Sequence, residues 1–273
     1  MLAPLDNETI FKKAFTDKEV FVQFVKDILN IDFKVGKIET EKKFEIPVGL
    51  IDIKFDIFAE STDNRVIVEI QRMDYDYNFD RFLDYFLAAI IELQKNYKSY
   101  KIEKTVYTIV LITAPYIINK QGMPVKDDVL ITELNPQNLK GQIRDIFGHK
   151  LVFLNPNYQD AQTPESIKDW LQLIHESINN PENPNINQNK PAIKRVAEII
   201  AEDKISPEER NLAKIDESRR AARELYIKFA KRERDYEIAT RFILKGYAND
   251  IIKDGTDFTD QEIEDLRNNL KVE

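Results

Sequence analysis

Apolar and polar residues alternate between positions 51 and 71, which predicts a β-hairpin. The apolar positions of its two strands are Ile51, Ile53, Phe55, Ile57, Val66, Val68 and Ile70. A tight polar turn centred on residues 62–63 makes the apolar face of one strand coincide with that of the other. A shift of one residue would set each apolar face against a polar one, so the pattern and the turn select the same register.

This register places two acidic side chains next to each other. Asp56 lies opposite Glu69, and Lys54 lies opposite Gln71, with about 5 Å between the Cβ atoms of opposed residues. Two adjacent carboxylates repel unless a cation or a proton lies between them. A hard divalent ion such as Mg²⁺ binds one or two carboxylates together with water and phosphate oxygens, an arrangement that cleaves phosphodiesters. The alternative is a solvated strand face whose charges pair across the ladder.

Further helices and strands are expected on both sides of the hairpin. Apolar residues at helical spacing predict helices over 7–29 (with a second helix start at residues 16–17), 78–97 and 164–179. Extended patterns predict strands over 37–47, 105–113, 128–134 and 151–154. This order of elements predicts an α/β or α+β fold in which helices flank a sheet.

A Pro- and Asn-rich stretch at 181–191 is the expected domain boundary. It separates a sheet domain, 1–180, from a region at 192–273 whose pattern is entirely helical. Over 190–245 this region has more Lys and Arg than Asp and Glu, although the whole chain is acidic. Such basic runs are either solvated helix faces or nucleic-acid contacts.

Composition narrows the chemistry further. The 273 residues carry a net charge of −8, which argues against a purely electrostatic coat on nucleic acid but not against a metal-dependent acidic site. The absence of Cys excludes disulfides and thiolate catalysis, and two His leave little for a zinc site. No apolar run is long enough to span a membrane, and the start of the chain has no signal-peptide core. We therefore expect a cytoplasmic protein without a membrane partner.

Five stretches of the chain carry, in order, a resemblance to a known family. They are DNETIFKKAFTD, FDIFAESTDNRVIVEIQ, FDRFLDYFLAAII, EKTVYTIVLIT and YEIATRFILKGYANDIIKDGTDFTDQEIEDL. Together they resemble the PD-(D/E)XK nuclease family transposases, also called recombination-promoting nucleases. The resemblance implies a restriction-endonuclease-like mixed sheet core flanked by helices, with an all-helical C-terminal region. It also implies a Mg²⁺- or Mn²⁺-dependent DNA endonuclease that acts in DNA recombination or in mobile-element or defence biology.

The resemblance implies roles for individual residues. Asp56 and Glu69 would bind the metal ion, and Gln71 would stand where the wider superfamily has a Lys. Gln carries no charge and cannot act as a general base, but its amide can orient a water molecule. The hairpin register suggests two further roles: Lys54, opposite Gln71, would restore the missing positive charge, and Arg81, on the helix after the hairpin, would contact a phosphate near the polar face of the hairpin. The alternative for Lys54 and Arg81 is that both are surface cations.

Three functions therefore remain open at this stage. The first is a metal-dependent DNA endonuclease, and the presence of Asp56, Glu69 and Gln71 together favours it. The second is a catalytically inactive DNA-binding or protein-interaction module on the same fold, and the third is a structural protein whose hairpin charges are solvated. A double-strand break would call for two sites and hence a homodimer, although no residue pattern indicates one.

Overall fold

The computed structural model describes residues 1–44, 53–72, 78–94, 101–114 and 126–270. The chain divides into two compact units, Met1–Ala213 and Lys214–Glu273. The division falls within helix α6 (Pro207–Leu244). Among the predicted positions, Ile51 of the hairpin lies outside the described residues.

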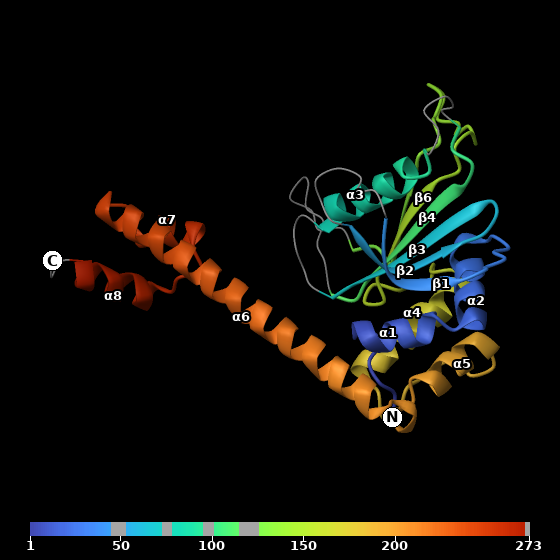
Figure 1. Ribbon diagram of the computed structural model, residues 1–273. Coiled ribbons are helices and arrows are strands. Elements are labelled where there is room, and N and C mark those ends of the chain that lie inside the picture. Colours follow the sequence, from blue (N-terminus) through green and yellow to red (C-terminus); the bar gives the residue numbers. More distant parts are fainter. Residues whose placement is uncertain (45–52, 73–77, 95–100, 115–125, 271–273) are drawn as a thin grey trace. The chain divides into compact units, whose positions relative to one another are not determined.

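A mixed sheet forms the centre of the first unit (Figure 1). Its strands are β1 (Ile38–Lys43), β2 (Lys54–Glu60), β3 (Asn64–Gln71), β4 (Thr105–Ile112), β5 (Val129–Glu133) and β6 (Lys150–Leu154). Within the described ranges the strand order is β1-β2-β3-β4-β6-β5. The pairs β3–β4 and β4–β6 are parallel, and the other pairs are antiparallel. This is the restriction-endonuclease-like mixed sheet that the sequence predicts.

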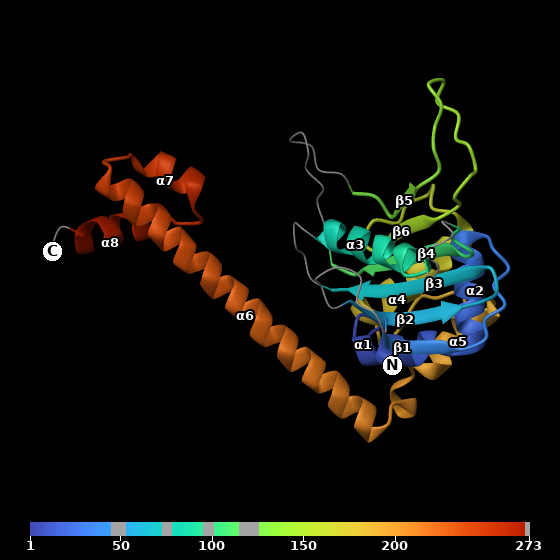
Figure 2. The ribbon, with the colours of Figure 1, turned by 45° about the horizontal axis from the view of Figure 1, so that its top comes forward.

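Helices cover both faces of the sheet (Figure 2). One face packs against α1 (Glu8–Phe15), α2 (Lys18–Leu29), α4 (Glu165–Asn179) and α5 (Pro191–Ile199), and the other packs against α3 (Asn78–Ile91). On the first face the rings of Phe15 and Phe24 lie 5.9 and 5.0 Å from that of Trp170. Trp170 is fully buried there and forms the centre of this aromatic cluster.

The predicted second helix start at residues 16–17 is confirmed. Asp17 has an extended backbone, and its carboxylate accepts hydrogen bonds from the N–H groups of Glu19 and Val20 at the start of α2. Asn7 caps α1 in the same way. These side chains satisfy N–H groups that lack partners inside a helix. Only residues 16 and 17 separate the end of α1 from the start of α2.

The predicted register of the hairpin is confirmed where the two strands pair. The partners run from Ile57 with Val68 to Glu60 with Arg65. The prediction that Phe55 and Ile57 share a face is wrong. Ile57 belongs to the core under α1, α2, α4 and α5, whereas Phe55 belongs to the core under α3. The alternation of side chains therefore breaks at Asp56, the residue between them.

A buried arginine ties the hairpin to the C-terminal end of α3. Arg65 is 3% exposed, and one guanidinium nitrogen donates to the carbonyl oxygen of Ala89 at 2.7 Å. The same guanidinium binds the carboxylates of Glu60 (2.6 Å) and Glu92 (2.7 Å). Positive charge is favourable at a helix C-terminus, so Arg65 fixes how α3 lies on the sheet.

The stretch at 181–191 and the helix after it pack against the first unit. Helix α5, which follows that stretch, buries Ile193 and Val196 fully in the same core as Trp170. Lys190, at the end of the stretch, lies 2.8 Å from a carboxylate oxygen of Asp27. Composition alone predicts a linker here, but apolar packing and ion pairs hold the stretch against the first unit.

The second unit is helical throughout its described part, as predicted. The C-terminal part of α6 packs with α7 (Asn249–Gly255) and α8 (Asp260–Leu270). Their common core consists of Ala239, Ile252, Phe258, Ile263 and Leu266. None of the helices in the described ranges is long and apolar enough to cross a membrane.

A buried histidine next to β6 makes stability depend on pH. His149 is 5% exposed, its Nδ1 accepts a hydrogen bond from the N–H of Val106 at 2.9 Å, and burial lowers its pKa from 6.5. Below pH 6.5 the unfolded chain binds a proton that the folded chain excludes, so stability falls as the pH drops. We expect the loss to reach at most about 1.4 kcal/mol per pH unit. Urea unfolding at pH 7.5 and 5.5 measures it.

The control is His149→Asn, because an amide oxygen can accept the same N–H bond without titrating. The variant is expected to lose less stability than the wild type between the two pH values. Equal losses in both proteins would contradict this role of His149.

Candidate functional site

The antiparallel ladder between β2 and β3 opens at Asp56 and Glu69. Beyond the pair of Ile57 with Val68, side chains take over the backbone bonds. The N–H of Asp56 donates to Oε1 of Glu69 at 3.1 Å, and the N–H of Ile70 donates to Oδ2 of Asp56 at 3.0 Å. Each carboxylate thus binds the backbone of the opposite strand, and the two predicted acidic residues are brought together.

The two carboxylates are shielded from water and interact with each other. Glu69 is 2% exposed, and the side chain of Asp56 is 16% exposed. Burial raises the pKa of Glu69 well above its ordinary value, and the charge of Asp56 raises it further. Burial also raises the pKa of Asp56, against the effect of the Ile70 N–H and of Lys12. A buried Glu69 contradicts the alternative of a solvated strand face.

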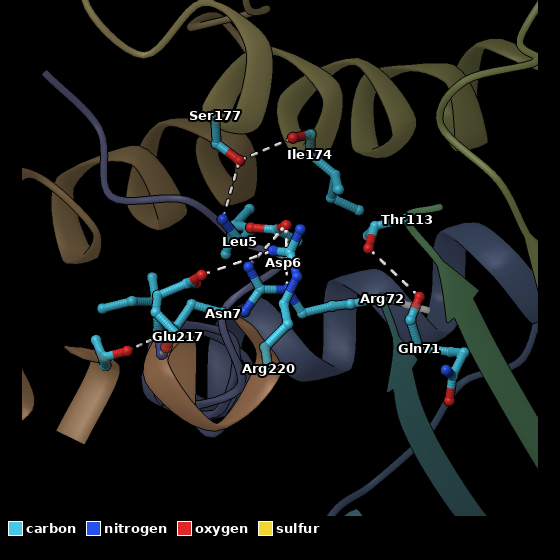
Figure 3. A network of polar contacts seen from close by, with 12 residues as sticks. Leu5, Asp6, Asn7, Gln71, Arg72, Thr113, Ile174, Ser177, Glu217 and Arg220 are labelled. Carbon is cyan, nitrogen blue, oxygen red and sulfur yellow. Dashed lines mark hydrogen bonds and ion pairs between the residues drawn. The ribbon is translucent and has the colours of Figure 1, made fainter. Parts of the chain in front are cut away.

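Gln71 lies at the end of β3, two residues beyond Glu69, and is 7% exposed. The parallel pairing of β3 with β4 continues to Gln71, opposite Ile112. Beyond it, the N–H and the hydroxyl of Thr113 donate to the carbonyl oxygen of Gln71 at 2.8 and 3.3 Å (Figure 3). Strand β3 is therefore held firmly by β4 where β2 turns away from it.

Helix α1 and strand β1 add charged residues that the sequence analysis missed. Carboxylate oxygens of Glu8, Glu41 and Asp56 lie within 4.8 Å of one another. The ammonium of Lys12 contacts Glu8 and Glu41 and lies 3.6 Å from Oδ1 of Asp56. The only available sequence signal was the spacing of four between Glu8 and Lys12, which puts them on one helix face. Nothing in the local pattern connects that face to residue 41 or residue 56.

Polar contacts fix the beginning of α1 near the end of β3 (Figure 3). Arg72 directly follows β3, and its guanidinium nitrogens lie 3.0 and 3.1 Å from a carboxylate oxygen of Asp6. The N–H of Leu5 donates to the hydroxyl of Ser177 on α4 at 3.1 Å. Both contacts precede the first turn of α1, so they orient the helix that carries Glu8.

The two cations singled out in the sequence, Lys54 and Arg81, lie at the edges of this cluster. Lys54 is half exposed and pairs with the carboxylate of Glu41. Arg81 is exposed on α3, its guanidinium lies 5.0 Å from the centre of the Tyr85 ring, and its charge lowers the pKa of both Asp56 and Glu69. Arg81 is thus near both carboxylates, whereas Lys54 approaches them through Glu41.

The donor atoms at the opening suit a hard divalent cation. Asp56 and Glu69 offer carboxylate oxygens from two neighbouring strands, and Glu8 offers a third from α1. Mg²⁺ and Mn²⁺ prefer such oxygen ligands to nitrogen or sulfur. Two carboxylates whose pKa values are raised by burial and mutual repulsion would both be stabilised in the ionised state by a bound cation.

A known protein family matches most of the chain. The family model described as PD-(D/E)XK nuclease family transposase matches residues 7–230. No curated protein matches the chain. The matched residues are more than half of the chain and include the sheet and the whole candidate site. The chain therefore belongs to the PD-(D/E)XK nuclease family transposases.

Proposed function

We propose that the protein is a DNA endonuclease that hydrolyses phosphodiester bonds with Mg²⁺ or Mn²⁺ held by Asp56 and Glu69. Its biological context would be DNA recombination or the control of mobile elements. The observation that carries the proposal is the opening of the β2–β3 ladder, which holds two buried carboxylates together and raises the pKa of both. Family membership supports a nuclease activity in general.

A bound divalent ion would polarise the scissile phosphate and lower the pKa of a water molecule that attacks it. The residues of the chain have separate parts in the proposal. Asp56 and Glu69 hold the ion, and Gln71 orients the attacking water through its amide. Lys54 and Arg81 contact phosphates of the DNA backbone. All of these residues belong to the unit Met1–Ala213.

The inactive DNA-binding or protein-interaction module is the competing function. The burial of Glu69 disfavours it, since a carboxylate with a raised pKa destabilises the folded chain whenever it is ionised. A cation that binds there would offset this cost. Perturbed carboxylates of this kind gather at functional sites.

Plasmid cleavage tests the proposal. Wild-type protein is expected to nick or linearise supercoiled DNA with Mg²⁺ but not with EDTA. Asp56→Asn and Glu69→Gln keep oxygen atoms that can accept the N–H bonds of Ile70 and Asp56, yet both variants are expected to lose cleavage because an amide is a poorer metal ligand than a carboxylate. Rates are measured from the decay of the supercoiled band.

The matched control is Asp63→Ala, an exposed aspartate at the tip of the same hairpin. It is expected to cleave at the wild-type rate. Folded wild-type protein that binds DNA but cuts none with either ion would favour the inactive module. Cleavage that survives in both carboxylate variants would place the active site elsewhere.

Removing the charge of Glu69 is expected to stabilise the metal-free protein. The pKa of Glu69 is raised in the folded state, so stability is lost as the pH rises above the ordinary value of 4.5. Glu69→Gln removes that loss. Each gain of about 1 kcal/mol in the free energy of unfolding raises Tm by roughly 2–4 °C for a chain of this size. Thermal unfolding in EDTA at pH 5 and 8 should show a gain that grows with pH. A lower Tm than the wild type at pH 8 would contradict the expectation.

Replacing Arg81 tests the proposed phosphate contact. Arg81→Ala is expected to weaken binding to duplex DNA in EDTA. Because one phosphate contact is lost, the slope of log K against log salt concentration is expected to become shallower by about one. Fluorescence anisotropy over a salt series measures both quantities. Arg144→Ala, at an exposed arginine in the loop before β6, is the control. Equal effects of the two variants would show that Arg81 has no specific contact.

A further inference from the structure

The ammonium group of Lys12 lies where the oxygens of three carboxylates converge. It contacts Glu8 and Glu41, and it lies 3.6 Å from Oδ1 of Asp56. The side chain of Lys12 is only 14% exposed. Three carboxylate oxygens within 4.8 Å of one another form an arrangement that could hold a divalent cation. In this structure the cation at their centre belongs to the chain.

The backbone holds this arrangement in place from both sides. Two residues of α1 on either side of Lys12, Phe11 and Phe15, are fully buried. Their rings stack with centres 4.5 Å apart. On β1, Glu41 has a φ of 55°, a left-handed conformation that costs a residue with a side chain about 1–2 kcal/mol. The carboxylate of this strained residue contacts both Lys12 and Lys54.

The charges around the opening also limit how many ions it can take. Among the residues that the structure describes, the carboxylates at the opening are those of Glu8, Glu41, Asp56 and Glu69, and the cations are those of Lys12, Lys54 and Arg81. These four negative and three positive charges sum to −1 when all are ionised. One divalent ion changes this to +1, and a second would change it to +3, which a phosphodiester with one negative charge would not offset.

We propose that Lys12 is a positioning residue that fills the second cation position of the site, so that the nuclease uses one divalent ion per chain. The proposal rests on the proposed function, in which Asp56 and Glu69 hold that ion. Lys12 supplies the positive charge that an uncharged Gln71 does not provide, and it holds the Asp56 carboxylate in place. A tethered ammonium does this without the entropy cost of binding a second ion from solution.

The experiment counts bound ions. Mn²⁺ binding to the full chain is measured by electron paramagnetic resonance and by titration calorimetry, without DNA. Wild-type protein is expected to bind one Mn²⁺ per chain. Lys12→Met keeps an unbranched side chain of similar length but removes its charge, so the three carboxylates become available and two Mn²⁺ per chain are expected. Lys12→Arg is expected to restore a count of one.

The control is Lys13→Met, the neighbouring lysine on α1, which pairs with Glu209 away from Asp56. Its expected count is one. A second readout is the Mg²⁺ dependence of cleavage, which should be hyperbolic for the wild type. For Lys12→Met it should be steeper, with a rate about 10–100-fold lower. A merely structural role of Lys12 would lower the rate without changing the number of ions.

The outcomes separate the two proposals. Wild-type protein that binds no Mn²⁺ would overturn the proposed function and this inference together. Wild-type protein that binds two ions would overturn the inference alone, and this measurement needs no variant to fold. Folded Lys12→Met that still binds one ion would also overturn it. One ion in the wild type and two in Lys12→Met would support it.

Discussion

The candidate site depends on the exchange of hydrogen bonds between Asp56 and Glu69. Where β2 leaves β3, two backbone N–H groups lose the carbonyl partners of a regular ladder, and an unsatisfied buried group costs about 1–3 kcal/mol. The two carboxylates accept these bonds instead, at 3.1 and 3.0 Å. Opening the ladder therefore draws two negative charges into a shielded space. The hydrogen bonds that satisfy these N–H groups also hold the two carboxylates close together, and a bound cation relieves the repulsion between them.

The remainder of the first unit holds this opening at a fixed place. Strand β3 stays paired with β4 as far as Gln71, so only β2 moves away. Arg72, the next residue, pairs with Asp6 and thereby joins α1 to the end of β3. Arg65, at the other end of β3, binds the last turn of α3. Both ends of one strand thus anchor helices on opposite faces of the sheet, and charged residues of α1 and α3 reach the same pair of carboxylates.

The sequence predicts the local features of this arrangement well and the non-local ones poorly. The register of the hairpin follows from alternation and the turn, and both are local, so the proximity of Asp56 and Glu69 was predictable. The shift of Phe55 to the other core was not predictable, because it accompanies the break at Asp56, where the backbone bonds to a side chain of the next strand. Glu41 and Lys12 were missed for the same reason, since their meeting depends on how α1 docks. The polar composition of 181–191 likewise says nothing of Ile193 and Val196, which pack just beyond it in the core of the first unit.

Because residue 71 is an uncharged glutamine, the positive charge next to Asp56 comes from another part of the first unit. A lysine at the end of β3 would be held near Glu69 by the strand alone. With glutamine there, the nearest described ammonium to Asp56 comes from α1, so the charge at the site depends on the docking of a helix. That docking rests on the pairing of Asp6 with Arg72 and on the aromatic core around Trp170. The electrostatics of the site are therefore coupled to the packing of the N-terminal helix, which is fixed by contacts at its start and along its buried face.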